Sequence, residues 1–196
     1  KELLLNRPPI PRSKPAEEGG CGVVGFAASV PVSGRHIFEP SIQMHNRGNG
    51  KGGGIAAACF NPAQLGVDET LLREDYILQV ALLDPKAEPE VEQAFIEPFL
   101  RVDHKTRMEP KTDHEKIGLE VRPPNITRYF VRVKPEVLET FRGENGFNGA
   151  PEREVEDEYI YRNSILLNQR FYASLGEQRA FVLSHARNLM IFKIVG

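Results

Sequence analysis

Apolar residues occupy consecutive positions in two short stretches near the start of the chain, and a glycine-rich segment separates them. The stretches "CGVVGFAAS" at 21–29 and "GIAAACF" at 54–60 predict short strands that are buried on both faces. Ser33 is a suitable N-cap for a short helix through about His45, with Pro40 tolerated only in its first turn. The glycines of "RGNGKGGG" predict a loop before the second strand.

The pattern changes between about 61 and 178. The run "DYILQVALL" at 75–83 predicts a strand, and the apolar spacing at 91–95 predicts a helix that Pro98 should soon end. In "TRYFVRV" at 127–133, apolar and basic residues alternate, which predicts a strand with one buried face. These elements mix strands and helices without a regular βαβ order.

Helical signals dominate the next part of the chain. Pro135 suits a helix start and Gly143 a helix stop. A longer helix is predicted from apolar residues that recur every four or eight positions, namely Val155, Tyr159, Leu167 and Phe171. The acids within 152–158 lie near its N-terminus, where the helix dipole favours them, and we expect them to form a solvated face. The run from 180 to 196 predicts two strands or one bent strand, so the fold class is α+β in a layered architecture.

The two ends of the chain differ from its middle. Residues 1–20 contain four prolines and no sustained period, which predicts an extended leader or linker before the domain of residues 21–196. The first residue is Lys, and the last strand ends on an apolar edge without a polar tail. We therefore expect this chain to be a piece of a longer polypeptide.

Composition restricts the classes of function. Apolar residues make up 40% of the chain and the net charge is −2, so we expect no nucleic acid and no membrane as a partner. No segment has the apolar length of a membrane span, and no secretory signal is visible. Two cysteines are too few for a disulfide framework, which predicts a cytoplasmic location, and Cys59 is expected to be a core residue. The histidines show no zinc-site spacing, so no metal is expected.

One set of residues near the start of the chain forms a candidate catalytic motif. Cys21 is followed by "GVVGF", then by Arg47 and Gly48, and then by a glycine-rich turn into "GIAA". This order resembles the start of class II glutamine amidotransferases, which are N-terminal-nucleophile hydrolases that typically open "CGI(V)GF" and continue "HRG…GAGI". Here Asn46 separates His45 from the arginine, and the glycine loop is longer. The glycine cluster and the later "SHARNLMIFK" are closer to the amidotransferase domains of glutamate synthases.

The resemblance implies a fold and a mechanism. The fold would be a four-layer αββα core, incomplete in this chain and interrupted by an inserted α+β lobe at about 61–178. A cysteine thiol has a pKa near ~8.5 and needs a base, which the α-amine of an N-terminal residue supplies. That amine is free only if the chain begins at Cys21, so residues 1–20 would be a propeptide cleaved after Gly20. The Cys21 thiolate would then attack the side-chain amide of L-glutamine, beside Arg47 and Gly48.

Other parts of the family's site have no counterpart here. Its second substrate arginine and its oxyanion Asn-Gly pair are not matched, because Asn145–Gly146 and Asn148–Gly149 precede "SHARNLMIFK" and predict turns instead. We expect the missing parts to lie beyond Gly196. We therefore expect this fragment by itself to be inactive. The resemblance implies an oligomer and a synthase domain or subunit that receives ammonia for nitrogen assimilation. FMN and iron–sulfur clusters would belong to that partner, with no cofactor in this chain.

Two alternatives remain open at the level of the sequence. The first is a non-catalytic regulatory or binding subunit with the same fold, in which the amine of Cys21 is never exposed. The second is the amidotransferase half of a phosphoribosylpyrophosphate amidotransferase. Nucleotide binding by "GNGKGGG" is disfavoured, because the loop lacks the Lys-Ser/Thr ending of a P-loop and precedes a strand.

Overall fold

The computed structural model describes residues 22–44, 52–111, 113–119 and 121–195, which fall into two compact units on either side of residues 52 and 53. In the first unit, a 3₁₀ turn at Gly34–Ile37 leads into α1 at Phe38–Met44, as the Ser33 signal predicted. The Ser33 side chain makes no capping hydrogen bond, and Pro40 falls in the first turn of α1.

The strand predicted at 21–29 is wrong over its described part. Residues 22–28 have no regular structure, and Val23 and Phe26 are 90% and 50% exposed. A strand that is buried on both faces needs neighbouring strands and a layer on each side. Within the described residues no strand pairs with this run.

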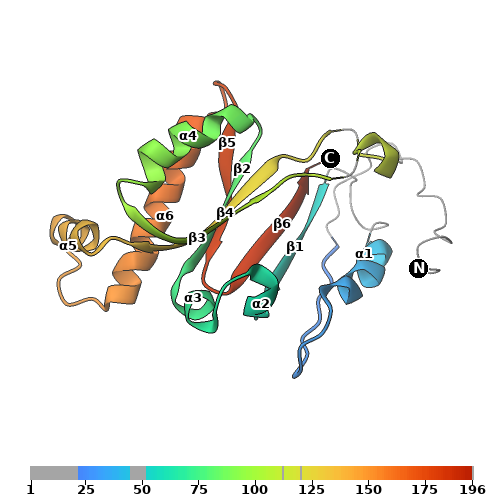
Figure 1. Ribbon diagram of the computed structural model, residues 1–196, viewed down its shortest axis with the longest axis horizontal. Helices are drawn as coiled ribbons and strands as arrows, with labels where there is room; N and C mark the ends of the chain where they lie inside the picture. The colour runs from blue at the N-terminus through green and yellow to red at the C-terminus, as the bar shows by residue number, and fades with distance from the viewer. Residues whose placement is uncertain (1–21, 45–51, 112, 120, 196) are drawn as a thin grey trace. The chain divides into compact units, whose positions relative to one another are not determined.

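The second unit is built on a four-stranded antiparallel sheet in the order β3-β4-β2-β5 (Figure 1). The strands are β2 at Tyr76–Leu82, β3 at Leu100–Met108, β4 at Asn125–Val133 and β5 at Ala180–Ala186. Every residue of β2 is buried, because β4 and β5 flank it and both of its faces are covered. The strand predicted at 75–83 is therefore confirmed.

Helices cover one face of this sheet (Figure 1). They are α4 at Glu88–Val91, continued by a π-helical turn at Glu92–Ile96, α5 at Pro135–Glu144 and α6 at Glu152–Phe171. The predicted start at Pro135 and the long helix after it are confirmed, although Gly143 lies inside the last turn of α5. Alternate strand residues meet the helices in one apolar core that includes Leu78, Val80, Tyr129, Val131, Ile160 and Leu167.

A second, two-stranded sheet contacts the opposite face. It consists of β1 at Gly52–Ala58 and β6 at Leu189–Val195, with α2 at Pro62–Leu65 and α3 at Glu69–Glu74 following β1. Ile77 and Phe130 of the larger sheet pack with Met190 of β6 and Leu72 of α3. The prediction of one buried face for 127–133 is wrong, because this second layer also covers Arg128, which is 8% exposed.

The predictions for the two chain segments that form the smaller sheet are confirmed in part. The strands at 54–60 and after 180 exist, but Gly54, Ala56 and Ala58 are exposed. Cys59 is not a core residue: it is exposed, with a φ of 60° just past the end of β1. Its backbone N–H donates to the oxygen of Asn188, at 3.2 Å, in the turn between β5 and β6.

Short turns complete the fold. The predicted turns at the two Asn-Gly pairs are confirmed, with φ values of 74° at Gly146 and 88° at Gly149. Further 3₁₀ turns lie at Pro85–Ala87 and Glu115–Ile117. The described fold is α+β, with a helix layer and two antiparallel sheets in the second unit. None of the described helices is both long enough and apolar enough to cross a membrane.

Strands from the region at about 61–178 share a sheet with a later strand. β2, β3 and β4 lie within that region, whereas β5 follows it, and β2 pairs with β5 along most of its length. The boundaries proposed for an inserted lobe remain a prediction.

Candidate functional site

The sequence-predicted site lies outside the described residues. Cys21, Arg47 and Gly48 all fall there, so their roles remain predictions. The described chain resumes at β1, directly after the glycine loop. A hollow in the second unit brings several charged side chains together, and the sequence did not predict it.

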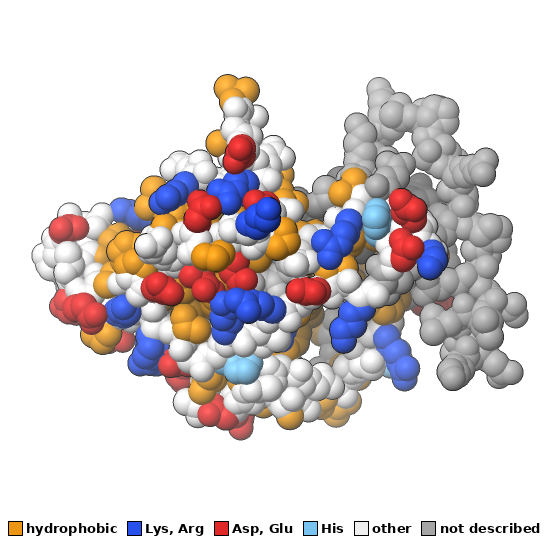
Figure 2. Space-filling view, turned by 45° about the horizontal axis from the view of Figure 1, so that its top comes forward, with side chains coloured by type: hydrophobic (Ala, Val, Ile, Leu, Met, Phe, Trp, Pro, Cys, Tyr) orange, Lys and Arg blue, Asp and Glu red, His pale blue; other side chains and the backbone are white. Residues whose placement is uncertain are grey.

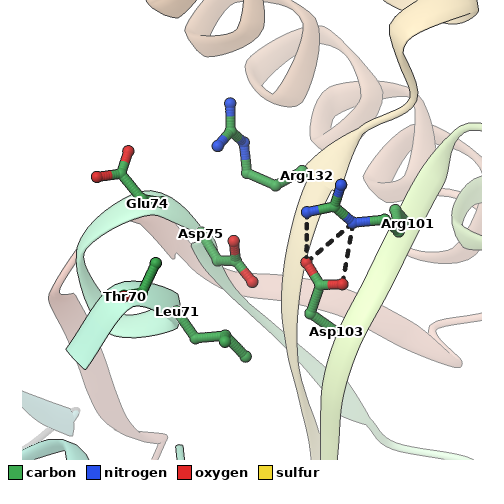
Figure 3. A pocket seen from close by; sticks show the side chains of 7 residues that line it. All are labelled: Thr70, Leu71, Glu74, Asp75, Arg101, Asp103 and Arg132. Carbon is green, nitrogen blue, oxygen red and sulfur yellow. Dashed lines mark hydrogen bonds and ion pairs between the residues drawn. The ribbon is translucent and has the colours of Figure 1, made fainter. Parts of the chain in front are cut away.

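This hollow is a pocket of about 400 Å³ between the end of α3 and strands β3 and β4 (Figure 3). The Asp68 carboxylate caps α3 by accepting from the Leu71 N–H at 2.8 Å. The chain leaves the helix at Asp75 and enters β2, and α3 contacts β4, the strand beside β2. The pocket is lined by Thr70, Leu71, Glu74, Asp75, Arg101, Asp103 and Arg132.

Asp75 is the most buried charged residue of the pocket. The residue is 3% exposed, and its Oδ2 atom has no hydrogen-bond partner among the described residues. Burial and the nearby Asp103 carboxylate raise the pKa of Asp75 from 3.8 to about 6. Figure 3 shows the two carboxyl groups facing each other across the pocket.

Arg101 and Asp103 form a two-point ion pair along β3. Arg101 Nε and Nη2 donate to the two carboxylate oxygens of Asp103 at 2.9 and 2.8 Å. Asp103 lies at a β-bulge, where the register of β3 against β4 shifts between Val102 and His104, and a bulge re-aims side chains locally. The hydrogen bonds to Asp103 raise the pKa of Arg101.

Arg132 is held from the helix layer. Its Nε donates to Glu156 Oε1 of α6 at 2.9 Å, and the Val133 N–H donates to the same oxygen at 2.9 Å. Arg187 donates to the other oxygen, Oε2. Glu156 is 1% exposed, so the prediction that all the acids at 152–158 form a solvated face is wrong at this position.

The helical spacing of the sequence indicates that Glu156 lies on the buried face of α6. The residue lies four positions before Ile160 and seven before Asn163, both of which are buried on the same face of α6. A carboxylate on an apolar face needs cationic or N–H donors, and the basic residues at alternate positions of β4 were the available candidates.

Arg187, in the turn after β5, joins several elements around the pocket wall. Its guanidinium lies 3.9 Å from the centre of the Tyr76 ring. It donates to the backbone oxygen of Glu74 at 3.0 Å and to Asp157 at 2.6 Å. The side chain therefore connects α3, β2 and α6 at the end of the sheet. It lies in the "SHARNLMIFK" segment, but its role was not predicted.

A second hollow of about 280 Å³ lies at the other end of the sheet, and Glu88 and Arg107 of its lining pair with each other. Glu88 accepts from Arg107 at 2.9 Å and from Thr127 at 3.0 Å, while Lys105 pairs with both Glu88 and Glu92. Burial raises the pKa of Tyr129, whose hydroxyl donates to Glu92 at 2.8 Å. The described residues around Glu88 and Glu92 form a structural charge network.

Two buried polar side chains between the sheets, Arg128 and Gln79, lack some of their hydrogen-bond partners among the described residues. Arg128 is buried, its Nη1 contacts Met190 Sδ at 3.7 Å, and its Nε has no partner among the described residues. Burial lowers its pKa. Gln79, opposite Arg128 on β2, donates to Ser184 and to the oxygen of Ile191, but its Oε1 is unpaired within the described chain.

Comparisons with protein-family models, with curated proteins and with solved structures found no match.

The described residues contain no group of three or more His, Cys, Asp or Glu that could hold a metal ion. On the face shown in Figure 2, acidic and basic side chains are interspersed.

Proposed function

We propose that this chain is the glutaminase half of a glutamate-synthase-like class II glutamine amidotransferase, with Cys21 as the nucleophile. One observation carries the proposal: Cys21 stands after two glycines and before "GVVGF", and Arg47 and Gly48 follow in a glycine loop that leads into "GIAA". The described structure supports only the α+β class, and it has β1 directly after that loop.

The proposed chemistry has two steps. After the leader is removed, the α-amine of Cys21 accepts the thiol proton, and the thiolate attacks the side-chain carbonyl carbon of glutamine. The C–N bond breaks, ammonia leaves with the proton that the amine returns, and a glutamyl thioester remains. Water then attacks the thioester, which releases glutamate and restores the thiol.

The proposed roles of Arg47 and of the loop follow from the same motif. Arg47 would fix the N-terminal residue beside the substrate, and Gly48 would let the backbone approach where a side chain would clash. Ammonia would pass to a synthase domain or subunit. FMN and iron–sulfur chemistry would belong to that partner.

The first test is the N-terminus of the mature protein. We expect N-terminal sequencing and intact mass of the full-length polypeptide to show a chain that begins at Cys21. A mature protein that retains residues 1–20 would contradict the proposed mechanism, because the α-amine of Cys21 would then be part of a peptide bond.

The second test is the reactivity of the thiol. In the full-length polypeptide, a glutamine analogue that carries an electrophile should label Cys21, and Cys21→Ala should abolish both labelling and glutamate release from glutamine. Cys59→Ala is the matched control, because Cys59 is the other cysteine and is exposed. Labelling of Cys59 alone, or no glutamate release by the unaltered protein, would instead favour a non-catalytic subunit. Full activity of Cys21→Ala would exclude Cys21 as the nucleophile.

A further inference from the structure

Asp75 is the acidic residue of the pocket lining that forms no ion pair with the described residues, although the charges of Arg101 and Arg132 partly offset the rise in its pKa. The carboxyl group lies within a charged lining that consists of Glu74 from α3, Arg101 and Asp103 from β3, and Arg132 from β4. The Oδ2 atom of Asp75 is enclosed and has no hydrogen-bond partner among the described residues, and a hydrogen bond shared with the Asp103 carboxyl favours the protonated form of Asp75. A buried carboxylate in this condition requires a proton or a cation.

The two arginines of the pocket are already committed to other carboxylates. Arg101 makes its two-point contact with Asp103, and the Nε atom of Arg132 donates to both carboxylate oxygens of Glu156. Glu74 pairs with Arg73 at 2.7 Å. After these pairs are matched, the charge that remains in the pocket is negative and belongs to Asp75.

A proton satisfies Asp75 only in mildly acidic solution. Because the pKa of Asp75 is about 6, at pH 7.5 most molecules carry the carboxylate in its ionised form. A metal ion is a poor match, because no three acidic or other metal-binding side chains of the described residues, including Glu74, Asp75 and Asp103, are grouped so that they could hold one. A group with N–H donors and a positive charge is the complementary ligand.

We propose that the pocket between α3, β3 and β4 is a binding site for an organic cation, and that the protonated amino group of the ligand is held by Asp75 beside Asp103. The ammonium supplies the charge and the donors that Asp75 lacks. A short apolar part of the ligand packs against Leu71 and the methyl group of Thr70, which line the same pocket. This site is separate from the proposed glutaminase chemistry and does not rest on it.

The test uses the full chain labelled with ¹⁵N and n-propylammonium chloride as the probe. At pH 7.5 we expect saturable shifts in the amide signals of residues 70–76, 101–103 and 132. At pH 5 the affinity should fall about tenfold, because most Asp75 carboxyls are then protonated. Tetramethylammonium, which has the charge but no N–H donor, should bind more weakly than n-propylammonium.

Asp75→Asn tests the residue itself. This change removes the charge, keeps the shape, and should weaken n-propylammonium binding about tenfold or more. Asp113→Asn is the matched control, because Asp113 is an exposed aspartate that does not line the pocket. Its binding should equal that of the unaltered chain.

Three results would overturn the proposal. The first is the absence of saturable shifts in the pocket at pH 7.5. The second is equal affinity at pH 5 and pH 7.5, a comparison that needs no variant. The third is unchanged binding by a folded Asp75→Asn chain. Equal binding of tetramethylammonium would overturn the assignment of an amino group to the ligand.

Discussion

Two buried carboxylates at the same end of the sheet have opposite surroundings. Glu156 is 1% exposed and accepts from Arg132, Arg187 and the Val133 N–H. Asp75 is 3% exposed, faces Asp103, and has an oxygen without a donor among the described residues. Similar burial therefore produces different chemistry, because the donors around a carboxylate decide whether its charge is stabilised.

The largest effect should follow the loss of Glu156. Glu156→Ala leaves Arg132 and Arg187 without their shared buried partner, so we expect the free energy of unfolding to fall by about 3–5 kcal/mol. Chemical denaturation measures this. Glu158→Ala on the same helix is the control, because Glu158 forms a more exposed pair with Arg162 and should cost less than about 0.5 kcal/mol. Equal losses would remove the contrast between buried and surface carboxylates.

Asp75→Asn should raise the free energy of unfolding, whereas Glu156→Ala should lower it. The amide is neutral and can donate to Asp103, so we expect the protein to become more stable by about 1–3 kcal/mol at pH 7. The pKa of Asp75 is higher in the folded state than in the unfolded state. In the unaltered chain, Asp75 therefore stabilises the folded state over the unfolded state below about pH 4. This contribution is lost as the pH rises through about 6.

Thermal unfolding at several pH values measures the Asp75 effect. The gain in stability of the Asp75→Asn chain should be present at pH 7 and should shrink toward pH 4. A variant that is less stable than the unaltered chain at pH 7 would show that the Asp75 carboxylate is stabilised by donors after all.

Arg128 extends the comparison to a buried cation. Its Nε has no partner among the described residues, and the charge is desolvated between the two sheets. Arg128→Met keeps much of the length and removes the charge, so we expect a gain of about 1–2 kcal/mol in the free energy of unfolding. Arg132→Met is the matched variant on the same strand, and it should be destabilising because Glu156 then loses a cation.

The smallest effect on stability is expected at Asp103. Asp103→Asn removes the like charge that faces Asp75, but it also weakens an exposed ion pair with Arg101, so the net change should stay under about 1 kcal/mol. The pKa of Asp75, followed by NMR titration, should fall from about 6 and remain above 3.8, because burial is the larger cause of the shift. An unchanged pKa would show that Asp103 does not influence Asp75.

Local pattern was sufficient for most elements of the second unit. The consecutive apolar residues of β2, the proline that begins α5 and the four-residue spacing of α6 each act over a few positions. The same reasoning failed at Cys59. A short apolar run does not reveal that the strand ends at Ala58 or that its outer face is exposed.

The pocket could not be predicted in this way. Asp75 and Asp103 are 28 positions apart, and their meeting depends on the pairing of β2 with β4 and of β4 with β3. Arg187 reaches Glu156 and Tyr76 only because β5 lies beside β2 and α6 covers the sheet. Sequence spacing contains no information about these contacts until the strand order is known.

The sequence by itself determined the α+β class, most helix and strand positions in the second unit, and a candidate nucleophile, Cys21, whose role remains a prediction. These depend on propensity, periodicity and motif, which act within a few residues. Only the tertiary structure decided which charges are buried and which have partners. Desolvation and pairing depend on neighbours that the strand order brings together, so Glu156 and Asp75 differ although each is one acid in a charged stretch.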